Sequence, residues 1–155
     1  MDSVASRLRP SIAQGLYNLS CSPKSSIRNR VAEEGAVDVF VRLGCSDAET
    51  DATRRLCMLG LVNLLWAADA DQRRAILSAG AVKVFAIAAR RPSAQDRLAA
   101  ATALHFASCF RSDVTPLLHD GGISALAGIL ARFARSGVAL SRSMPSNHSA
   151  DVTEA

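Results

Sequence analysis

The sequence is poor in aromatic residues and lacks closely paired cysteines, and both absences narrow the classes of protein to which it can belong. Phe, Trp and Tyr together make up 5% of the 155 residues, while alanine and leucine supply most of the apolar ones. Because β-sheets favour aromatic and β-branched residues, this composition predicts packed helices. The four cysteines form no Cys-x-x-Cys pair and no histidine lies at metal-ligand spacing from them, so we predict free thiols in a reducing, cytoplasmic or nuclear compartment.

Motifs for catalysis and for membrane insertion are also missing. The sequence has no Gly-x-Ser-x-Gly, no phosphate-binding glycine loop and no metal-binding box. Glu33 and Glu34 are adjacent, so on a helix they point about 100° apart and make a poor acid–base pair. The run from Leu56 to Ala68 is apolar except for Asn63, but it is too short to span a bilayer. We therefore predict no enzymatic activity, no cofactor, no metal and no membrane span.

The charge is mildly basic, with a formal net charge of +4 and a pI near 9.2. The arginines are scattered along the sequence, which favours a solvated surface over a nucleic-acid-binding face. The length allows one domain, which we place at residues 1–135. Serine is frequent from 136 to 155 and Pro145 interrupts this stretch, so we predict a flexible tail there.

A segment that occurs three times dominates the organisation of the chain. Its copies span Val31–Phe40, Ile76–Phe85 and, more weakly, Leu117–Leu126. The glycines that anchor them are Gly35, Gly80 and Gly121, which lie 45 and then 41 residues apart. Periods of about 40–47 residues are typical of α-helical solenoids.

Each repeat predicts three helices around its glycine. The first is expected at roughly 23–34, 70–79 and 112–120, with Pro23 and Pro116 at helix starts. Glycine can end it, because glycine turns the chain left-handed without a Cβ penalty. The second helix follows at once. The third is the longest, and we expect capping boxes before it at Ser46–Glu49 and Ser93–Asp96.

These residues resemble the armadillo repeat. The shared pattern is Asn-Leu-Ser or its equivalent, a short variable stretch, and then Glu-x-Gly-Ala-Val before an apolar helix. Asn18 and Asn63 both stand seventeen residues before their glycine. In the third copy the matching frame lies fifteen residues before Gly121 and has Phe106 where the asparagine should be. The resemblance covers roughly residues 12–130. It implies an all-α fold, an armadillo-type right-handed α-solenoid with about two full three-helix repeats plus partial repeats at both ends.

The resemblance also implies a function. In armadillo proteins that bind extended peptides, third helices line a groove in which the asparagine contacts the peptide backbone, and Asn18 and Asn63 match that position. A primary amide offers a donor and an acceptor together, so it can pair with any backbone amide. We expect a non-catalytic protein–protein interaction module, a scaffold or adaptor that binds an extended or helical protein segment. The expected groove residues are Asn18, Asn63, Arg55, Gln14, Leu59, Trp66, Thr102 and His105.

Several alternatives remain open for these residues. Asn63 could instead bond to the backbone of the neighbouring repeat and fix its register, and Trp66 could lie in the core or between repeats. Arg54 and Arg55 could simply be two solvated surface charges, and His105 could be a packed or a surface histidine. At the level of function, the chain could be the substrate-recognition part of an E3 ubiquitin ligase. An importin-like transport adaptor is less favoured, because Gln14 and Leu59 stand where importins place tryptophan.

The predicted helices leave the repeat array open at both ends. The chain is expected to begin within a third helix and to finish after a second helix near Arg135. The apolar residues of that last helix are Ile123, Leu126, Ile129, Leu130 and Phe133. Since solenoid units bury their faces only against neighbours, some of these side chains must stay uncovered. We expect a longer array, a partner, or self-association through the open repeat ends to cover them.

Overall fold

The protein is all-helical in the part that the structure, a computed structural model, describes. Residues 4–109 and 114–143 are described, with side chains from 7 to 109 and from 114 to 135, and none of these residues forms a β-strand. This confirms the predicted all-α class. The elements are α1 (Val4–Ser20), α2 (Ser25–Val31), η1 (Ala32–Ala36), α3 (Val37–Cys45), α4 (Asp51–Ala67), α5 (Ala70–Ile76), η2 (Leu77–Ala81), α6 (Val82–Ala89), α7 (Ala94–Ser108), α8 (Thr115–His119) and α9 (Gly122–Ser143).

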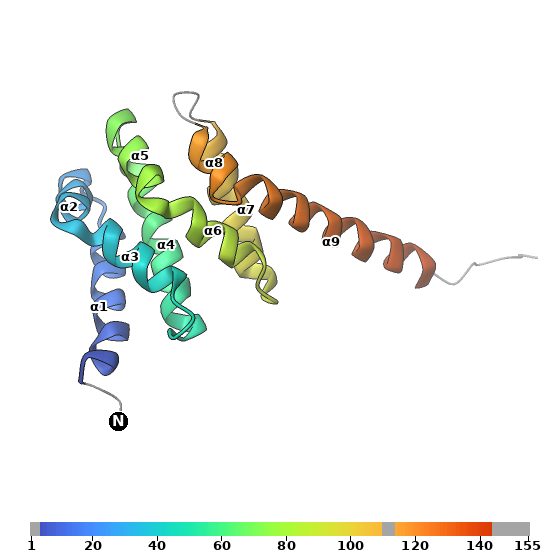
Figure 1. The fold of residues 1–155 in the computed structure, drawn as a ribbon, viewed down its shortest axis with the longest axis horizontal. Coiled ribbons are helices and arrows are strands. Elements are labelled where there is room, and N and C mark those ends of the chain that lie inside the picture. Colours follow the sequence, from blue (N-terminus) through green and yellow to red (C-terminus); the bar gives the residue numbers. More distant parts are fainter. Residues whose placement is uncertain (1–3, 110–113, 144–155) are drawn as a thin grey trace, which may run out of the picture.

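Equivalent helices of successive repeats lie side by side (Figure 1). Helix α3 packs on α6, and α6 packs on α9, so these three follow one another in one row. In a second row, α1 packs on α4 and α4 contacts α7. The two rows pack on each other through α3 with α4 and α6 with α7.

The repeated glycines stand at equivalent corners of the chain. Gly35, Gly80 and Gly121 have φ of 89°, 104° and 80°. The first two lie inside η1 and η2, where the chain kinks between the first and second helix of a repeat, and Gly121 lies between α8 and α9. L-residues with a Cβ rarely adopt this left-handed conformation. The helix-ending role that the repeat predicts for these glycines is confirmed.

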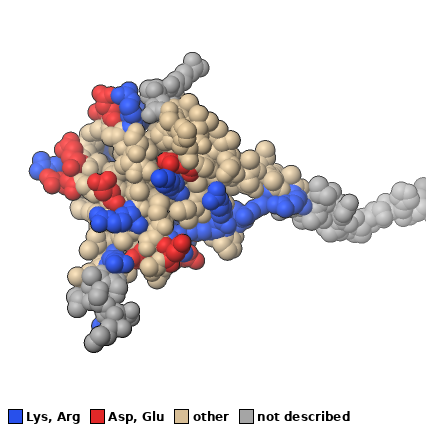
Figure 2. All heavy atoms as spheres, in the orientation of Figure 1, with Lys and Arg blue, Asp and Glu red and all other residues tan. Residues whose placement is uncertain are grey.

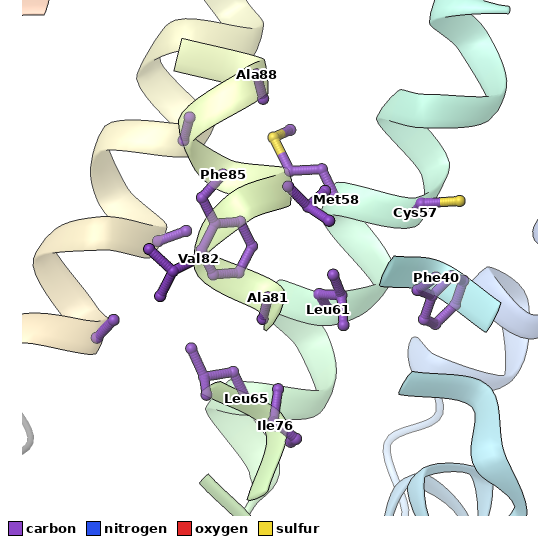
Figure 3. Close-up of a cluster of buried hydrophobic side chains, with 14 of the residues drawn as sticks. Phe40, Cys57, Met58, Leu61, Leu65, Ile76, Ala81, Val82, Phe85 and Ala88 are labelled. Atoms are coloured by element: carbon purple, nitrogen blue, oxygen red, sulfur yellow. The ribbon is translucent and has the colours of Figure 1, made fainter. Parts of the chain in front are cut away.

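Helix α4 is buried on two sides, as its continuous apolar run predicts (Figure 3). One side carries Met58, Leu61 and Leu65, which point toward α6. The other side meets α3: a Cβ built on Gly60 would lie 2.4 Å from Cζ of Phe40. The chain therefore places its smallest residue where the fully buried Phe40 ring crosses α4.

The start of α4 differs from the prediction. Its N-cap is Thr50, whose Oγ1 accepts a hydrogen bond from the Thr53 amide at 3.2 Å, so the expected capping box at Ser46–Glu49 is wrong. The Glu49 amide instead donates to the Ser46 carbonyl in a turn. The Glu49 side chain is buried and forms an ion pair with Arg9 of α1 at 3.1 Å. The Glu49 carboxylate, which the local sequence pattern assigned to a capping box, is therefore used in a tertiary ion pair.

Two other predicted helix starts are confirmed in part. Ser93 is the N-cap of α7 and accepts a hydrogen bond from the Asp96 amide at 3.2 Å. Pro116 lies in the first turn of α8, as its missing N–H requires. Helix α2, however, begins at Ser25 after Lys24, so Pro23 precedes the helix. A complete capping box that was not predicted joins Asp69 and Gln72 at the start of α5.

The last helix extends beyond the expected domain boundary. Helix α9 runs from Gly122 to Ser143, whereas the tail was expected from residue 136. Residues 144–155 of the expected tail lie outside the described residues.

Candidate protein-interaction surface

The residues expected to line a groove all lie on α1, α4 and α7. We call the exposed or half-buried side chains of these helices the third-helix surface. It comprises Gln14 and Asn18 of α1, Arg55, Leu59, Asn63 and Trp66 of α4, and Leu98, Thr102, His105 and Phe106 of α7. Helices α4 and α7 lie behind α3 and α6 in Figure 1, so the part of this surface that they carry is on the far side from the one seen in Figure 2.

Asn63 ties α4 to the end of α1. Its Nδ2 donates to Oγ of Ser20 and to Sγ of Cys21, both at 3.2 Å. The Ser20 side chain is fully buried, and its hydroxyl also donates to the Tyr17 carbonyl. The amide nitrogen therefore joins neighbouring repeats, but it does so through the side chains of Ser20 and Cys21 and not through the backbone bond that the structural alternative expected. The carboxamide oxygen makes no hydrogen bond within the described residues.

Trp66 and Phe106 form a stacked aromatic pair between α4 and α7. Their ring centroids are 4.7 Å apart with an interplanar angle of 23°. Trp66 is 66% exposed, whereas Phe106 is half-buried against the core. The Arg73 guanidinium of α5 lies over the Phe106 ring, with Cζ 5.8 Å from the centroid. Trp66 thus lies between repeats, as one alternative predicted, and still presents a large apolar face to solvent.

Arg55 joins α4 to the first turn of α7. Its Nη2 donates to Oε1 of Gln95 at 2.7 Å, and its Nε lies 2.7 Å from Oδ1 of the buried Asp96. This second contact is an ion pair without hydrogen-bond alignment, since Asp96 Oδ1 remains without a hydrogen bond. The expected solvated pair is therefore not what the structure shows, because the Arg54 guanidinium also has partners, Asp47 and Asp51. Arg55 is therefore engaged inside the protein as well as half exposed.

A second arginine borders the same recess. Arg91 is buried, and its Nη1 lies 3.9 Å from Oδ2 of Asp96. Burial is the main cause that lowers the pKa of Arg91, and the neighbouring Arg54 lowers it further. A recess of about 390 Å³ opens here, lined by Asp51, Ala52, Arg55, Arg91, Pro92, Ser93 and Asp96. Two arginines face two aspartates, so the recess has no excess of either charge.

The remaining predicted residues are exposed or half-buried. Gln14 donates from Nε2 to Oδ1 of Asn18 at 2.9 Å, so these two amides form a solvent-exposed pair along α1. Thr102 donates to the Leu98 carbonyl within α7, and His105 is exposed. Leu59 packs in part against the core.

The sequence reasoning missed two members of this surface. From the sequence, Phe106 was recognised only as the residue that replaces the repeated asparagine in the third copy, yet it is the stacking partner of Trp66. Leu98 is 69% exposed and stands at the position of α7 that corresponds to Arg55. The signal for both was available, because the repeat frame places Leu98 and Phe106 on the same face as Arg55 and Asn63.

The thiols differ in environment. Burial raises the pKa of Cys57 from 9.0 to about 12 and, more weakly, raises that of Cys45, whereas Cys21 and Cys109 are exposed. A side-chain hydrogen bond with Cys21 is the main cause that raises the pKa of Tyr17. Within the described residues no three His, Cys, Asp or Glu side chains come together as a metal site.

Basic side chains gather on the face opposite to the third-helix surface. In Figure 2 they follow α9 toward its C-terminal end. The described ones are Arg132, which donates to the Arg90 carbonyl, and Arg135, which donates within its own helix. None of the helices formed by residues 4–109 and 114–143 has the length and hydropathy that crossing a membrane requires.

No family model, no curated protein and no solved structure matches this chain. A function for it must therefore be inferred from its own residues and their geometry.

Proposed function

We propose that the chain is an armadillo-type α-solenoid that acts as a protein–protein interaction module and binds an extended protein segment along the third-helix surface. The observation that carries this proposal is the exposed aromatic stack of Trp66 and Phe106 between α4 and α7. Tryptophan is enriched among the residues that contribute most to binding at protein interfaces, because it offers a large rigid face.

The neighbours of the stack suit a peptide. The free carboxamide oxygen of Asn63 stands one helical turn before Trp66 and can accept a hydrogen bond from a backbone N–H. Leu98, Thr102 and His105 continue the surface along α7 with apolar and small polar side chains. An apolar side chain of the segment would pack on Trp66 while its backbone meets Asn63. No catalytic group is required for this role.

Trp66 makes the proposal directly testable, because it is the single tryptophan of the chain. Peptides would be selected from a random displayed library against the immobilised chain, and the affinity of a selected peptide measured by calorimetry. We expect Trp66→Ala to weaken binding by about tenfold or more, since residues of this kind often contribute over 1.4 kcal/mol. Binding should also shift the Trp66 fluorescence toward shorter wavelength as water leaves the ring.

The matched control is Leu118→Ala, which removes an equally exposed apolar side chain on α8, outside the third-helix surface. This variant should bind the selected peptide as the wild type does. Peptides whose affinity falls with Leu118→Ala but not with Trp66→Ala would refute the proposal.

A further inference from the structure

The two end helices of the molecule each leave an apolar face uncovered (Figure 1). On α1, Leu8, Ile12 and Leu19 are about half exposed. On α9, Ile123, Leu130 and Phe133 are exposed, Phe133 to 77%. Isolated exposed apolar residues are ordinary, but a row of them along one helix face indicates an association surface.

The internal repeat shows which face of α4 corresponds to the exposed apolar face of α1. Asn18 and Asn63 lie 45 residues apart, so α1 corresponds position by position to α4. The side of α4 that covers α3 comprises Thr53, Cys57, Gly60 and Leu64, all of them buried. The corresponding residues of α1 are Leu8, Ile12, Gly15 and Leu19. Ile12 is 48% exposed where Cys57 is fully buried, and a Cβ built on Gly15 meets nothing within 4 Å.

The other side of α1 behaves as its counterpart in α4 does. Met58, Leu61 and Leu65 point toward the following second helix, α6 (Figure 3). Their equivalents are Ala13, Leu16 and Ser20, of which Ala13 and Ser20 are fully buried. Helix α1 therefore occupies the place of a third helix that covers the second helix after it, while its opposite face is open. Ile12 lies at the border of the two faces, because it also lines a recess with Val39 and Leu43 of α3.

In helix α9 the exposed face is instead the one that would contact a following third helix. In α3, Phe40 faces α4, where it meets Gly60. Gly44 lies between α4 and α6, since a Cβ built on it would be 3.4 Å from Cβ of Cys57 and 2.8 Å from Cγ1 of Val84. Counted from the anchor glycines Gly35 and Gly121, the equivalents in α9 are Leu126 and Leu130. Leu130 is 69% exposed and Leu126 half-buried. Helix α9 is a second helix whose third-helix face is open.

We propose that α1 of one copy docks on α9 of a second copy, head to tail, as α4 docks on α3 within the chain. Gly15 would then face Leu126 as Gly60 faces Phe40, and Ile12 would face Leu130 as Cys57 faces Gly44. Leucines stand at both of these positions of α9, in place of Phe40 and Gly44, so the face of the second helix stays apolar. The two surfaces differ, so each added copy presents a new open end and the contact generates open chains.

A second copy suits these faces because one chain carries both of them in matching repeat register. Arginines flank both faces, Arg7 and Arg9 on α1, Arg132 and Arg135 on α9, so charge attraction does not drive the contact. Salt should therefore not weaken it. If the proposed function also holds, the third-helix surface would continue from α7 onto Gln14 and Asn18 of the next copy.

The experiment is sedimentation velocity over a wide range of concentrations. The wild type should form progressively larger species. Ile12→Glu and Leu130→Glu, each at an exposed position, should each be monomeric alone, with unchanged helical content by circular dichroism. Mixed in equal amounts, they should form a dimer and nothing larger, because the mixture retains one intact α1 face and one intact α9 face.

Two controls separate this proposal from the other one. Leu118→Glu on α8 should assemble as the wild type does, and so should Trp66→Ala, which lies on the third-helix surface. A wild type that stays monomeric at every concentration overturns the proposal. So does a mixture of the two glutamate variants that remains monomeric, or a wild-type assembly that salt dissolves. Should glutamate lower the helical content, Ile12→Ser and Leu130→Ser provide the same comparison with a smaller perturbation.

Discussion

The junction between α1 and α4 and the junction between α4 and α7 use the same two repeat positions with different chemistry. At the first, Asn63 bonds to Cys21 and to the adjacent Ser20. At the second, Phe106 holds the position of Asn63, Trp66 holds that of Cys21, and the two rings stack at 4.7 Å. The repeat therefore determines which positions meet, while the side chains decide whether the contact is polar or aromatic.

This comparison explains why the helices still pack side by side although the third copy has Phe106 where the first two copies have asparagine. A polar pair and an aromatic pair can each join two neighbouring third helices, provided that both members are compatible. The polar junction leaves little apolar surface exposed, whereas the aromatic junction leaves most of Trp66 in water. The two junctions thus contribute differently to stability and, in the proposed function, to binding.

The largest expected difference concerns the thiols. Cys21 at the polar junction is exposed, whereas Cys57 in the core of α4 is fully buried. Maleimide should label Cys21 rapidly in the native chain, and Cys57 only when the chain unfolds, slower by orders of magnitude, since the thiolate is the reactive form. Mass spectrometry of digested samples taken over time would give both rates. Comparable rates would show that the core around α4 opens readily.

The same buried thiol predicts an alkaline loss of stability. The folded chain holds the pKa of Cys57 at about 12, above the 9.0 of an exposed thiol. Between these values the unfolded chain releases the proton and the folded chain keeps it, so rising pH favours unfolding. The contribution is fully present below pH 9 and is lost as the pH rises toward 12. Urea unfolding of Cys57→Ala should show a smaller decline over this window than the wild type.

The aromatic junction gives the next largest effect. Phe106→Ala should lower the free energy of unfolding by about 2 kcal/mol, because it removes a half-buried ring and the stack that this ring forms with Trp66. Trp66→Ala should cost about 1 kcal/mol, since the exposed Trp66 ring loses mainly the stack. The control is Leu98→Ala on the same helix, where the exposed side chain should change stability by less than about 0.5 kcal/mol. Chemical denaturation would rank the three, and equal losses for Phe106 and Leu98 would contradict the stack.

Much of the fold could be predicted from the sequence because the repeat encodes it. The glycine spacing predicted three equivalent corners, and Gly35, Gly80 and Gly121 have the expected positive φ. The apolar run of α4 predicted its burial. Local patterns predicted less well where tertiary contacts compete: Glu49 pairs with Arg9 of α1 and leaves the cap to Thr50.

The candidate surface could be predicted only in outline. The repeat placed the expected residues on α1, α4 and α7, but their partners come from the neighbouring helix and not from the local sequence. Arg55 meets Gln95 and Asp96 across 40 residues or more, and Asn63 meets Ser20 across 43. Such pairings depend on how far adjacent layers rotate, which periodicity does not specify.

The smallest expected effect distinguishes the two asparagines that the repeat makes equivalent. Asn63→Ala removes a contact to α1 and should lower the free energy of unfolding by about 1 kcal/mol. Among the described residues the Asn18 side chain bonds only to the exposed Gln14 of its own helix, so Asn18→Ala should cost less than about 0.5 kcal/mol. Calorimetric melting of both variants would measure the difference, and equal losses would mean that the contact of Asn63 with Ser20 does not stabilise the junction.

The same pair of variants separates the roles of Asn63 in stability and in binding. Its nitrogen is engaged with α1, but its oxygen is free, so only the oxygen can serve a bound segment. If that oxygen accepts a hydrogen bond from the segment, Asn63→Ala weakens the selected peptide by more than its loss of stability accounts for, at temperatures where the variant is fully folded. An unchanged Kd together with a lower melting temperature would assign Asn63 to the junction alone, and Trp66 would then remain as the anchor of the surface without an amide beside it.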